Sequence, residues 1–246
     1  MRNSLVTIFS AALLLSACST ADYDRIPRTG FISHYQKADQ GDVPFASYWV
    51  APAYDQAACD KTLEKERIVC VKPVTLTHYN GKPATAAEAT AIEQLRSHFD
   101  QCLQQEFAKA AAKHPQMKLT GNPKGAWVVE IALLDACSAS TGKNLVSGAL
   151  GQITGGGFLW GRLISTRDER TGYLAMAARI YDPQGKLIAE VADFAYGMSA
   201  PVDTKDYRPY AYQRRTVEQW AEDFATLSVS PFQKRVNRTS FSLNPF

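Results

Sequence analysis

The sequence lacks an apolar run long enough to cross a lipid bilayer. The run near its start, Leu5 to Leu15, has eleven residues, whereas a spanning helix needs about 20. The sequence also lacks a strong charge of either sign, because 27 basic and 24 acidic side chains leave a formal net charge of +3. This balance argues against a nucleic-acid-binding surface, which needs clustered Lys and Arg on one face.

Motifs of the common enzyme and metal-binding classes are missing as well. Ser147 does not lie in a G-x-S-x-G nucleophile elbow, because Leu145 stands where that motif requires glycine. The histidines show no HExxH spacing, and the cysteines match no zinc-ligand pattern. The glycines at 155–157 lack the Lys-Ser/Thr ending of a phosphate loop. We therefore predict no catalytic residues, no metal ligands, no bound cofactor and no enzymatic activity.

The first eighteen residues contain a secretory signal followed by a lipobox. Arg2 supplies positive charge, the apolar run follows, and Leu15-Ser16-Ala17-Cys18 comes directly after it. This pattern resembles bacterial lipoproteins, which implies cleavage before Cys18, a diacylglycerol on its sulfur and a third acyl chain, such as palmitate, on the new amine. Three chains anchor a protein almost permanently, because each buried methylene contributes about 0.8 kcal/mol. Ser19 favours sorting to the outer membrane, facing the periplasm, because inner-membrane retention usually requires Asp there.

Four further cysteines, Cys59, Cys70, Cys102 and Cys137, would then lie in an oxidising periplasm. Even numbers of thiols in that compartment usually pair. Three connectivities exist, and we favour Cys59 with Cys70 and Cys102 with Cys137, since each pair joins elements that we expect to be neighbours. The alternative is that the thiols are buried and unpaired.

The most strongly predicted helix runs from Thr85 to about His114. Thr85 and Glu88 form a capping box. The apolar side chains that recur at helical spacing are Ile92, Leu95, Phe99, Leu103 and Phe107. A second helix is predicted to start at Thr216 and to end before Pro231.

Four strands are predicted around these helices. Residues 67–77 are rich in Val, Ile and Thr, although Pro73 indicates a strand end or a sheet edge. Residues 126–136 alternate between two faces, and residues 173–196 form a hairpin with its turn at 182–185. The order predicts an α+β fold, in which a small, mostly antiparallel sheet in β-α-β-β-β-α order has its helices packed on one face.

These patterns divide the chain into four parts. Residues 1–17 form the signal peptide, and residues 18–30 form a lipidated tether that is polar and contains a Pro and a Gly. Residues 31–230 form a single periplasmic domain, because no internal repeat or low-complexity run interrupts them. Residues 231–246 are a C-terminal tail.

Two segments are candidate interaction surfaces. Residues 207–215 interleave aromatic side chains with arginines, which are enriched at binding hot spots; alternatively, this loop packs its tyrosines on the sheet. Residues 144–161 carry no charge, include six glycines and end in an apolar tip suited to membrane contact or self-association; alternatively, they are a connector. The side chains concerned are Tyr207, Tyr210, Tyr212, Arg214, Arg215, Phe158 and Trp160.

Several short motifs together resemble an uncharacterised family of bacterial lipoproteins with a domain of unknown function. These motifs are the lipobox, Thr29-Gly30-Phe31-Ile32-Ser33-His34-Tyr35, Lys72-Pro73-Val74, the Asp-Pro-Gln-Gly hairpin and Trp220. The sequence departs from the pattern at His34, where an acidic residue is common, and in its additional cysteines. We expect a non-catalytic binding or assembly module whose partners are the membrane, through its lipid, and an envelope protein or a second copy. The alternative is an oligomeric component of an export or pore complex.

Overall fold

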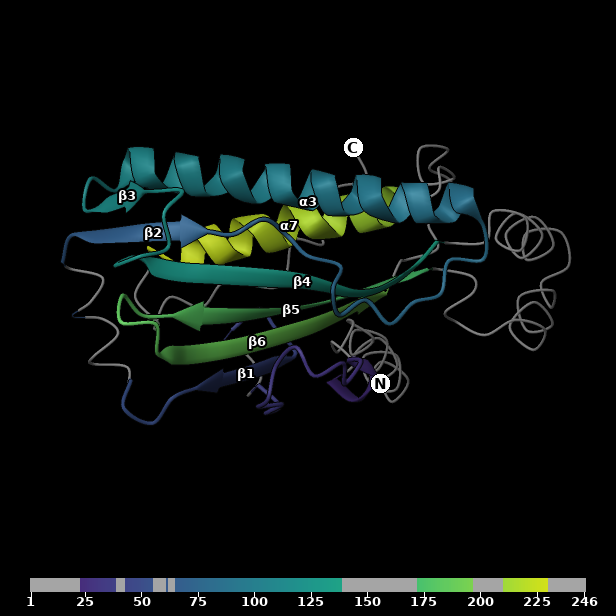
Figure 1. Cartoon of the computed structure of the whole chain (residues 1–246), viewed down its shortest axis with the longest axis horizontal. Coiled ribbons are helices and arrows are strands. Elements are labelled where there is room, and N and C mark those ends of the chain that lie inside the picture. The colour runs from purple at the N-terminus through teal and green to yellow at the C-terminus, as the bar shows by residue number, and fades with distance from the viewer. Residues whose placement is uncertain are drawn as a thin grey trace, which may run out of the picture.

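Two helices lie along one face of a six-stranded sheet in this computed structural model (Figure 1). The structure describes residues 23–38, 43–54, 61, 65–138, 172–196 and 210–229. The elements in chain order are η1 (Tyr23–Arg25), β1 (Ser47–Val50), β2 (Arg67–Val71), α3 (Ala86–Lys113), β3 (Met117–Leu119), β4 (Trp127–Cys137), β5 (Tyr173–Tyr181), β6 (Leu187–Tyr196) and α7 (Ala211–Leu227). This is the predicted α+β architecture, with β1 and β3 as additional short strands.

The sheet is antiparallel on one side and parallel on the other. Its strand order is β1-β6-β5-β4-β2-β3, and β1, β6, β5 and β4 are antiparallel neighbours. β2 is parallel to both β4 and β3. Because α3 connects β2 to β3, the chain crosses over and returns in the same direction, as a parallel pair requires.

Helix α3 confirms the prediction at both ends. The hydroxyl of Thr85, the N-cap residue, accepts the backbone N–H of Glu88 at 3.1 Å, and the Glu88 carboxylate accepts the N–H of Ala84 at 2.8 Å. The helix ends at Lys113, two residues before Pro115. None of the described helices is both long and apolar enough to cross a membrane.

Helix α7 begins earlier than the sequence predicted. The expected start, Thr216, lies inside the helix, where its hydroxyl donates to the carbonyl of Tyr212 at 3.1 Å. The helix begins at Ala211, after Tyr210, whose φ of 60° places it in the left-handed region. The first turn instead buries Gln213, which is 1% exposed. Gln213 is a polar residue that is buried with hydrogen bonds. It therefore does not appear in the apolar pattern from which the start of the helix was predicted.

The main core fills the space between the helices and the sheet. The apolar stripe predicted for α3 faces it, and all five of its members are at most 3% exposed. On α7, Trp220 packs against Phe99 of α3, with their ring centroids 6.0 Å apart. Alternate residues of β4, including Ile131 and Leu133, form the sheet side of this core. The core therefore joins both helices to the central strand of the sheet.

The N-terminal segment covers the opposite, outer face of the sheet. Ile26, Phe31 and Ile32 are at most 3% exposed and pack in one cluster with alanines of the sheet, among them Ala132 and Ala177. The sequence predicted a tether up to residue 30 because the segment is polar and contains a Pro and a Gly. Small alanine side chains allow its backbone to approach the sheet closely. The described part of the predicted tether therefore belongs to the folded body.

Replacing Leu103 by alanine will test the importance of the core between α3 and the sheet. Leu103 is 0% exposed, so Leu103→Ala removes buried methyl groups, leaves a cavity and should lower the free energy of unfolding by about 2–5 kcal/mol. Urea denaturation measures this change. Gln105→Ala, at an exposed position of the same helix, should change stability by less than about 0.5 kcal/mol. Equal losses in the two variants would contradict the described packing.

Candidate functional site

The buried carboxylate of Glu190 holds the N-terminal segment on the outer face of the sheet. Glu190 lies in β6 and is 1% exposed. Its carboxylate accepts the backbone N–H groups of Ser33 at 3.0 Å and His34 at 2.7 Å, and lies 2.7 Å from Nδ1 of His34. These donors replace the hydrogen bonds that water would make to an exposed carboxylate. These contacts, which we call the Glu190 clamp, thus fasten the motif at 29–35 to the sheet.

A row of ionisable side chains crosses the outer face from this carboxylate. Its members are His34, Glu190, Arg179, Glu130 and Lys72. Arg179 donates to Glu130 at 3.0 Å, and Lys72 donates to the same carboxylate at 2.5 Å. Burial opposes the ionisation of Glu130, but the two cations outweigh burial and lower its pKa. The row therefore joins β4 to β5 by an ion pair, and Arg179 lies opposite Glu190 in the pairing of β5 with β6.

Aromatic rings cover this row of ionisable side chains. The ring of His34 stacks on Trp49 of β1, with a centroid separation of 3.8 Å. The guanidinium of Arg179 lies 4.3 Å from the centroid of Phe31. Both contacts join the N-terminal segment to the sheet beneath it, so the segment is held by stacking as well as by hydrogen bonds.

The beginning of the described segment carries arginines packed on tyrosine rings. Arg28 lies 3.8 Å from the ring centroid of Tyr35 and 5.1 Å from that of Tyr23. Arg25 lies 5.4 Å from the ring centroid of Tyr196, at the end of β6. The Tyr23 hydroxyl donates to the carbonyl of Tyr35 at 2.5 Å. Because Tyr23 also packs against the apolar cluster on the outer face of the sheet, the segment is fixed to the body from its first described residue.

The structure separates the members of the predicted surface at 207–215. Tyr210 is 5% exposed, and its hydroxyl donates to Glu88 of α3 at 3.4 Å. Because it is buried, Tyr210 is not part of an exposed surface, and burial also raises its pKa. Tyr212 is half-buried, whereas Arg214 and Arg215 are exposed. The predicted residues outside the described ranges are Cys18, Cys59, Phe158, Trp160 and Tyr207.

The predicted disulfide between Cys102 and Cys137 is absent, and Cys70, which was predicted to pair with Cys59, is not in a disulfide. The carbonyl of Cys137 accepts from Gln213, in the first turn of α7, at 2.6 Å, whereas Cys102 lies beside Glu218. The two cysteines therefore lie beside different turns of α7. The spacing of the cysteines along the sequence does not show which of them are neighbours in the fold.

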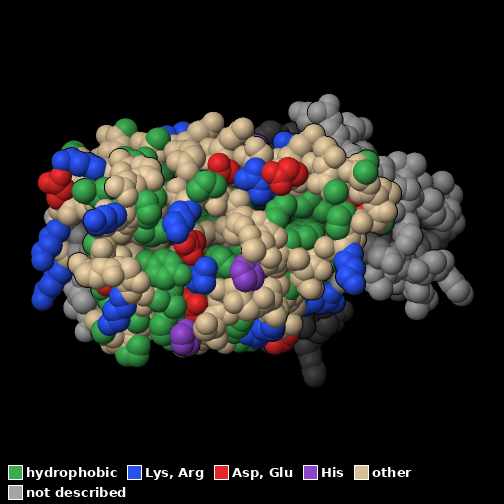
Figure 2. Space-filling model, in the orientation of Figure 1, with side chains coloured by type: hydrophobic (Ala, Val, Ile, Leu, Met, Phe, Trp, Pro, Cys, Tyr) green, Lys and Arg blue, Asp and Glu red, His purple; other side chains and the backbone are tan. Residues whose placement is uncertain are grey.

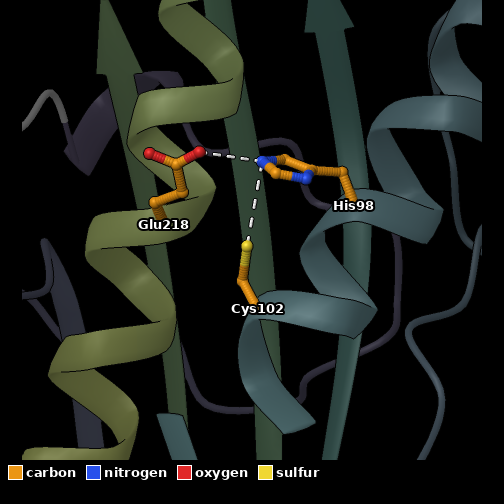
Figure 3. A group of neighbouring side chains, drawn as sticks. All are labelled: His98, Cys102 and Glu218. Carbon is orange, nitrogen blue, oxygen red and sulfur yellow. Dashed lines mark hydrogen bonds and ion pairs between the residues drawn. The ribbon is translucent and has the colours of Figure 1, made fainter. Parts of the chain in front are cut away.

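Cys102 instead belongs to a group of three potential metal ligands between α3 and α7, which we call the His-Cys-Glu cluster (Figure 3). His98 and Cys102 lie one turn apart on α3, and Glu218 points toward them from α7. Nε2 of His98 is 2.9 Å from Oε1 of Glu218 and 3.7 Å from Sγ of Cys102. Burial raises the pKa of the Cys102 thiol, and the Glu218 carboxylate adds to this effect.

The His-Cys-Glu cluster has no metal-ligand spacing along the chain by which the sequence could reveal it. The one local signal was the spacing of four residues between His98 and Cys102, which places both side chains on the same face of a helix. The third member comes from a helix far along the sequence. Only the packing of α7 against α3 brings Glu218 to the other two.

A shallow, open groove of about 670 Å³ lies at the sheet edge opposite β1. The ends of β2 and β3 line it, together with Gln104 of α3. Ile68 and Leu119, on the same two strands, are 44% and 39% exposed. Figure 2 shows basic side chains gathered at the end of the molecule that carries β3, with acidic ones among them. This edge combines exposed apolar side chains with charged neighbours.

The chain matches the model of one protein family and is distantly similar to two solved structures. The model of a family described as protein of unknown function (DUF3313) matches residues 28–224. No curated protein matches the chain. A PelC dodecamer from Paraburkholderia phytofirmans has 10% identity and a TM-score of 0.32, covering 72% of this chain and 94% of that one. A second PelC dodecamer from the same organism has 12% identity and a TM-score of 0.31, covering 76% and 96%.

Replacing Glu190 by glutamine will test how the N-terminal segment is held. Glu190→Gln keeps the shape but removes one acceptor and presents an amide donor to the N–H groups of Ser33 and His34. Leaving buried donors unsatisfied should lower the free energy of unfolding by about 1–3 kcal/mol. Trypsin should then cleave faster after Arg25 and Arg28. The control, Glu93→Gln, changes a carboxylate that is 57% exposed and should leave cleavage unchanged; unchanged cleavage in both variants would contradict the clamp.

The stability contributed by Glu130 will depend on pH. Because folding lowers its pKa, the ionised carboxylate stabilises the fold above its ordinary pKa of about 4.3. This contribution disappears as the pH falls through the lowered value. Urea denaturation should therefore show Glu130→Gln to be less stable than the unchanged protein by up to about 1 kcal/mol at neutral pH, and equally stable in strong acid. A difference that persists in strong acid would show that packing, not charge, is responsible.

Proposed function

This chain is a member of the DUF3313 family, and we propose that it is a lipid-anchored outer-membrane protein whose body is a non-catalytic binding or assembly module in the periplasm. The attachment of the N-terminal segment to the sheet carries this proposal. The lipobox predicts a lipid on Cys18, and only four residues separate Cys18 from Tyr23. Because that stretch reaches at most about 18 Å, the lipid would hold the body close to the membrane.

The Glu190 clamp supports a defined orientation of the body relative to its anchor. A flexible linker would allow the body to tumble, because its ends fluctuate independently. Here the chain is packed from Tyr23 onward, and Glu190 binds the backbone at Ser33 and His34. Arg25 and Arg28 are the described basic residues nearest to Cys18 in the sequence, and arginine side chains favour an anionic headgroup region. This arrangement suits a module that presents one surface to a partner.

The groove beside β2 and β3 is the surface that we assign to the partner. It lies at the opposite sheet edge from β1, whereas η1 packs near the end of β6, beside β1. Exposed Ile68 and Leu119 lie close to charged side chains such as Lys118, and apolar surface with a polar rim is typical of protein interaction sites. The partner is therefore an envelope protein or a second copy of this chain.

Removal of the lipid acceptor tests the anchor. Cys18→Ser should incorporate no acyl label and should move from the membrane fraction to the soluble fraction, because the thiol is the acceptor that the lipobox presents. Labelling and fractionation of cells measure both effects. Cys137→Ser, which changes a half-buried cysteine inside the body, should remain labelled and membrane-bound. Acyl label on the Cys18→Ser protein would contradict the proposed anchor.

Crosslinking in intact cells tests the partner surface. A photoreactive residue at position 119, beside the groove, should give an adduct, whereas the same residue at position 108, exposed on α3, should not. The adduct mass identifies the partner, since a mass of two chains indicates self-association and another mass indicates a different protein. Equal adducts at both positions, or none at position 119, would contradict the assignment of the groove.

A further inference from the structure

The His-Cys-Glu cluster has the donor set of a transition-metal site. A thiolate, an imidazole and a carboxylate are the three ligand types that proteins use for Zn²⁺. We propose that His98, Cys102 and Glu218 bind one divalent ion of the zinc class, and that the fourth position is taken by water or by a donor from a partner. This site is independent of the lipid anchor and of the groove, so its failure would leave the proposed function standing.

Two distances within the cluster are close to those around such an ion, and all three ligand atoms lie within 4.8 Å of one another. Tetrahedral bonds to sulfur and nitrogen place these two atoms about 3.6 Å apart, and Sγ of Cys102 lies 3.7 Å from Nε2 of His98. Nitrogen and oxygen ligands lie about 3.3 Å apart around the same ion, whereas Nε2 and the Glu218 carboxylate are 2.9 Å apart. Glu218 would therefore move outward by about 0.4 Å. Its side chain is 52% exposed, which leaves room for that movement.

The ligands are mounted on well-packed helices. Phe99 and Leu103, the residues that follow His98 and Cys102, are 0% exposed, and so is Val217, which precedes Glu218. Buried neighbours hold the backbone at each ligand position, which reduces the cost of bringing the three donors together. The side chain of His98 is 24% exposed, so an ion can enter from solvent. The site is therefore preorganised and accessible.

Binding requires a simple exchange of protons and charge. The Cys102 thiol releases its proton to solvent, and the resulting thiolate donates an electron pair to the ion. His98 donates the lone pair of Nε2 and keeps its proton on Nδ1, while Glu218 donates a carboxylate oxygen. One dication, one thiolate and one carboxylate leave the site without net charge. A neutral site avoids the cost of an uncompensated charge beside the core.

Cobalt absorption tests the site in the full-length protein, purified in detergent and reduced with a phosphine. Co²⁺ should produce the intense visible bands of tetrahedral cobalt and a thiolate-to-cobalt charge-transfer band in the near ultraviolet. The bands should saturate at one Co²⁺ per chain, and Zn²⁺ should abolish them by displacement. Wild-type protein that shows no charge-transfer band would overturn the proposal, and the cluster would then be only an ion pair beside a free thiol.

Variants of each ligand, with matched controls, assign the bands to these residues. Cys102→Ser should eliminate the charge-transfer band, whereas Cys137→Ser should retain it. His98→Gln and Glu218→Gln should weaken Co²⁺ binding by at least about tenfold, which is the smaller loss seen when even the partners of metal ligands are removed. Glu222→Gln, one turn along α7 and exposed, should bind normally.

Circular dichroism of each variant separates loss of the site from loss of the fold. A folded Cys102→Ser protein that keeps the charge-transfer band would overturn the proposal, because the sulfur ligand would then lie elsewhere. Folded His98→Gln and Glu218→Gln proteins with unchanged affinity would overturn it as well.

Discussion

The burial of the Glu190 carboxylate is the constraint on which the outer layer of this protein depends. A charge that is 1% exposed must be surrounded by donors, because burial without partners costs several kcal/mol. The donors come from the backbone at Ser33 and His34 rather than from the sheet itself. The N-terminal segment must therefore lie on β6, and in that position it covers the apolar outer face with Ile26 and Phe31.

A second buried carboxylate, Asp193, performs a related task on the helix side of the same strand. It accepts the indole N–H of Trp220 at 2.9 Å and the backbone N–H of Ala46 at 3.0 Å. One side chain thereby joins α7 to β6 and to the segment before β1. Because the two acidic residues are three positions apart in a strand, they point to opposite faces. The strand β6 thus joins the helix layer and the N-terminal layer to one sheet.

The packing of α7 against α3 has a chemical consequence as well as a structural one. Trp220 and Phe99 meet in the core, and this contact sets the two helices so that Glu218 reaches His98 and Cys102 at the surface. The cluster lies in the helix layer, whereas the segment that leads to the predicted lipid lies on the other face of the sheet (Figure 1). In the proposed arrangement, the anchor and the metal site therefore occupy opposite layers of the molecule.

The sequence by itself determined the elements whose signals are local. Helix α3 was predicted with both ends because a cap and an apolar stripe lie within its own residues, and the β5–β6 hairpin because its turn connects adjacent strands. Contacts between distant segments decided the rest. The first turn of α7 depends on the bond from Gln213 to Cys137, the unpaired state of Cys102 depends on its position along α3, and the His-Cys-Glu cluster depends on both helices. Hydrogen bonds and ligand contacts require two groups to meet in space, and a periodic pattern along one segment records only which face that segment buries.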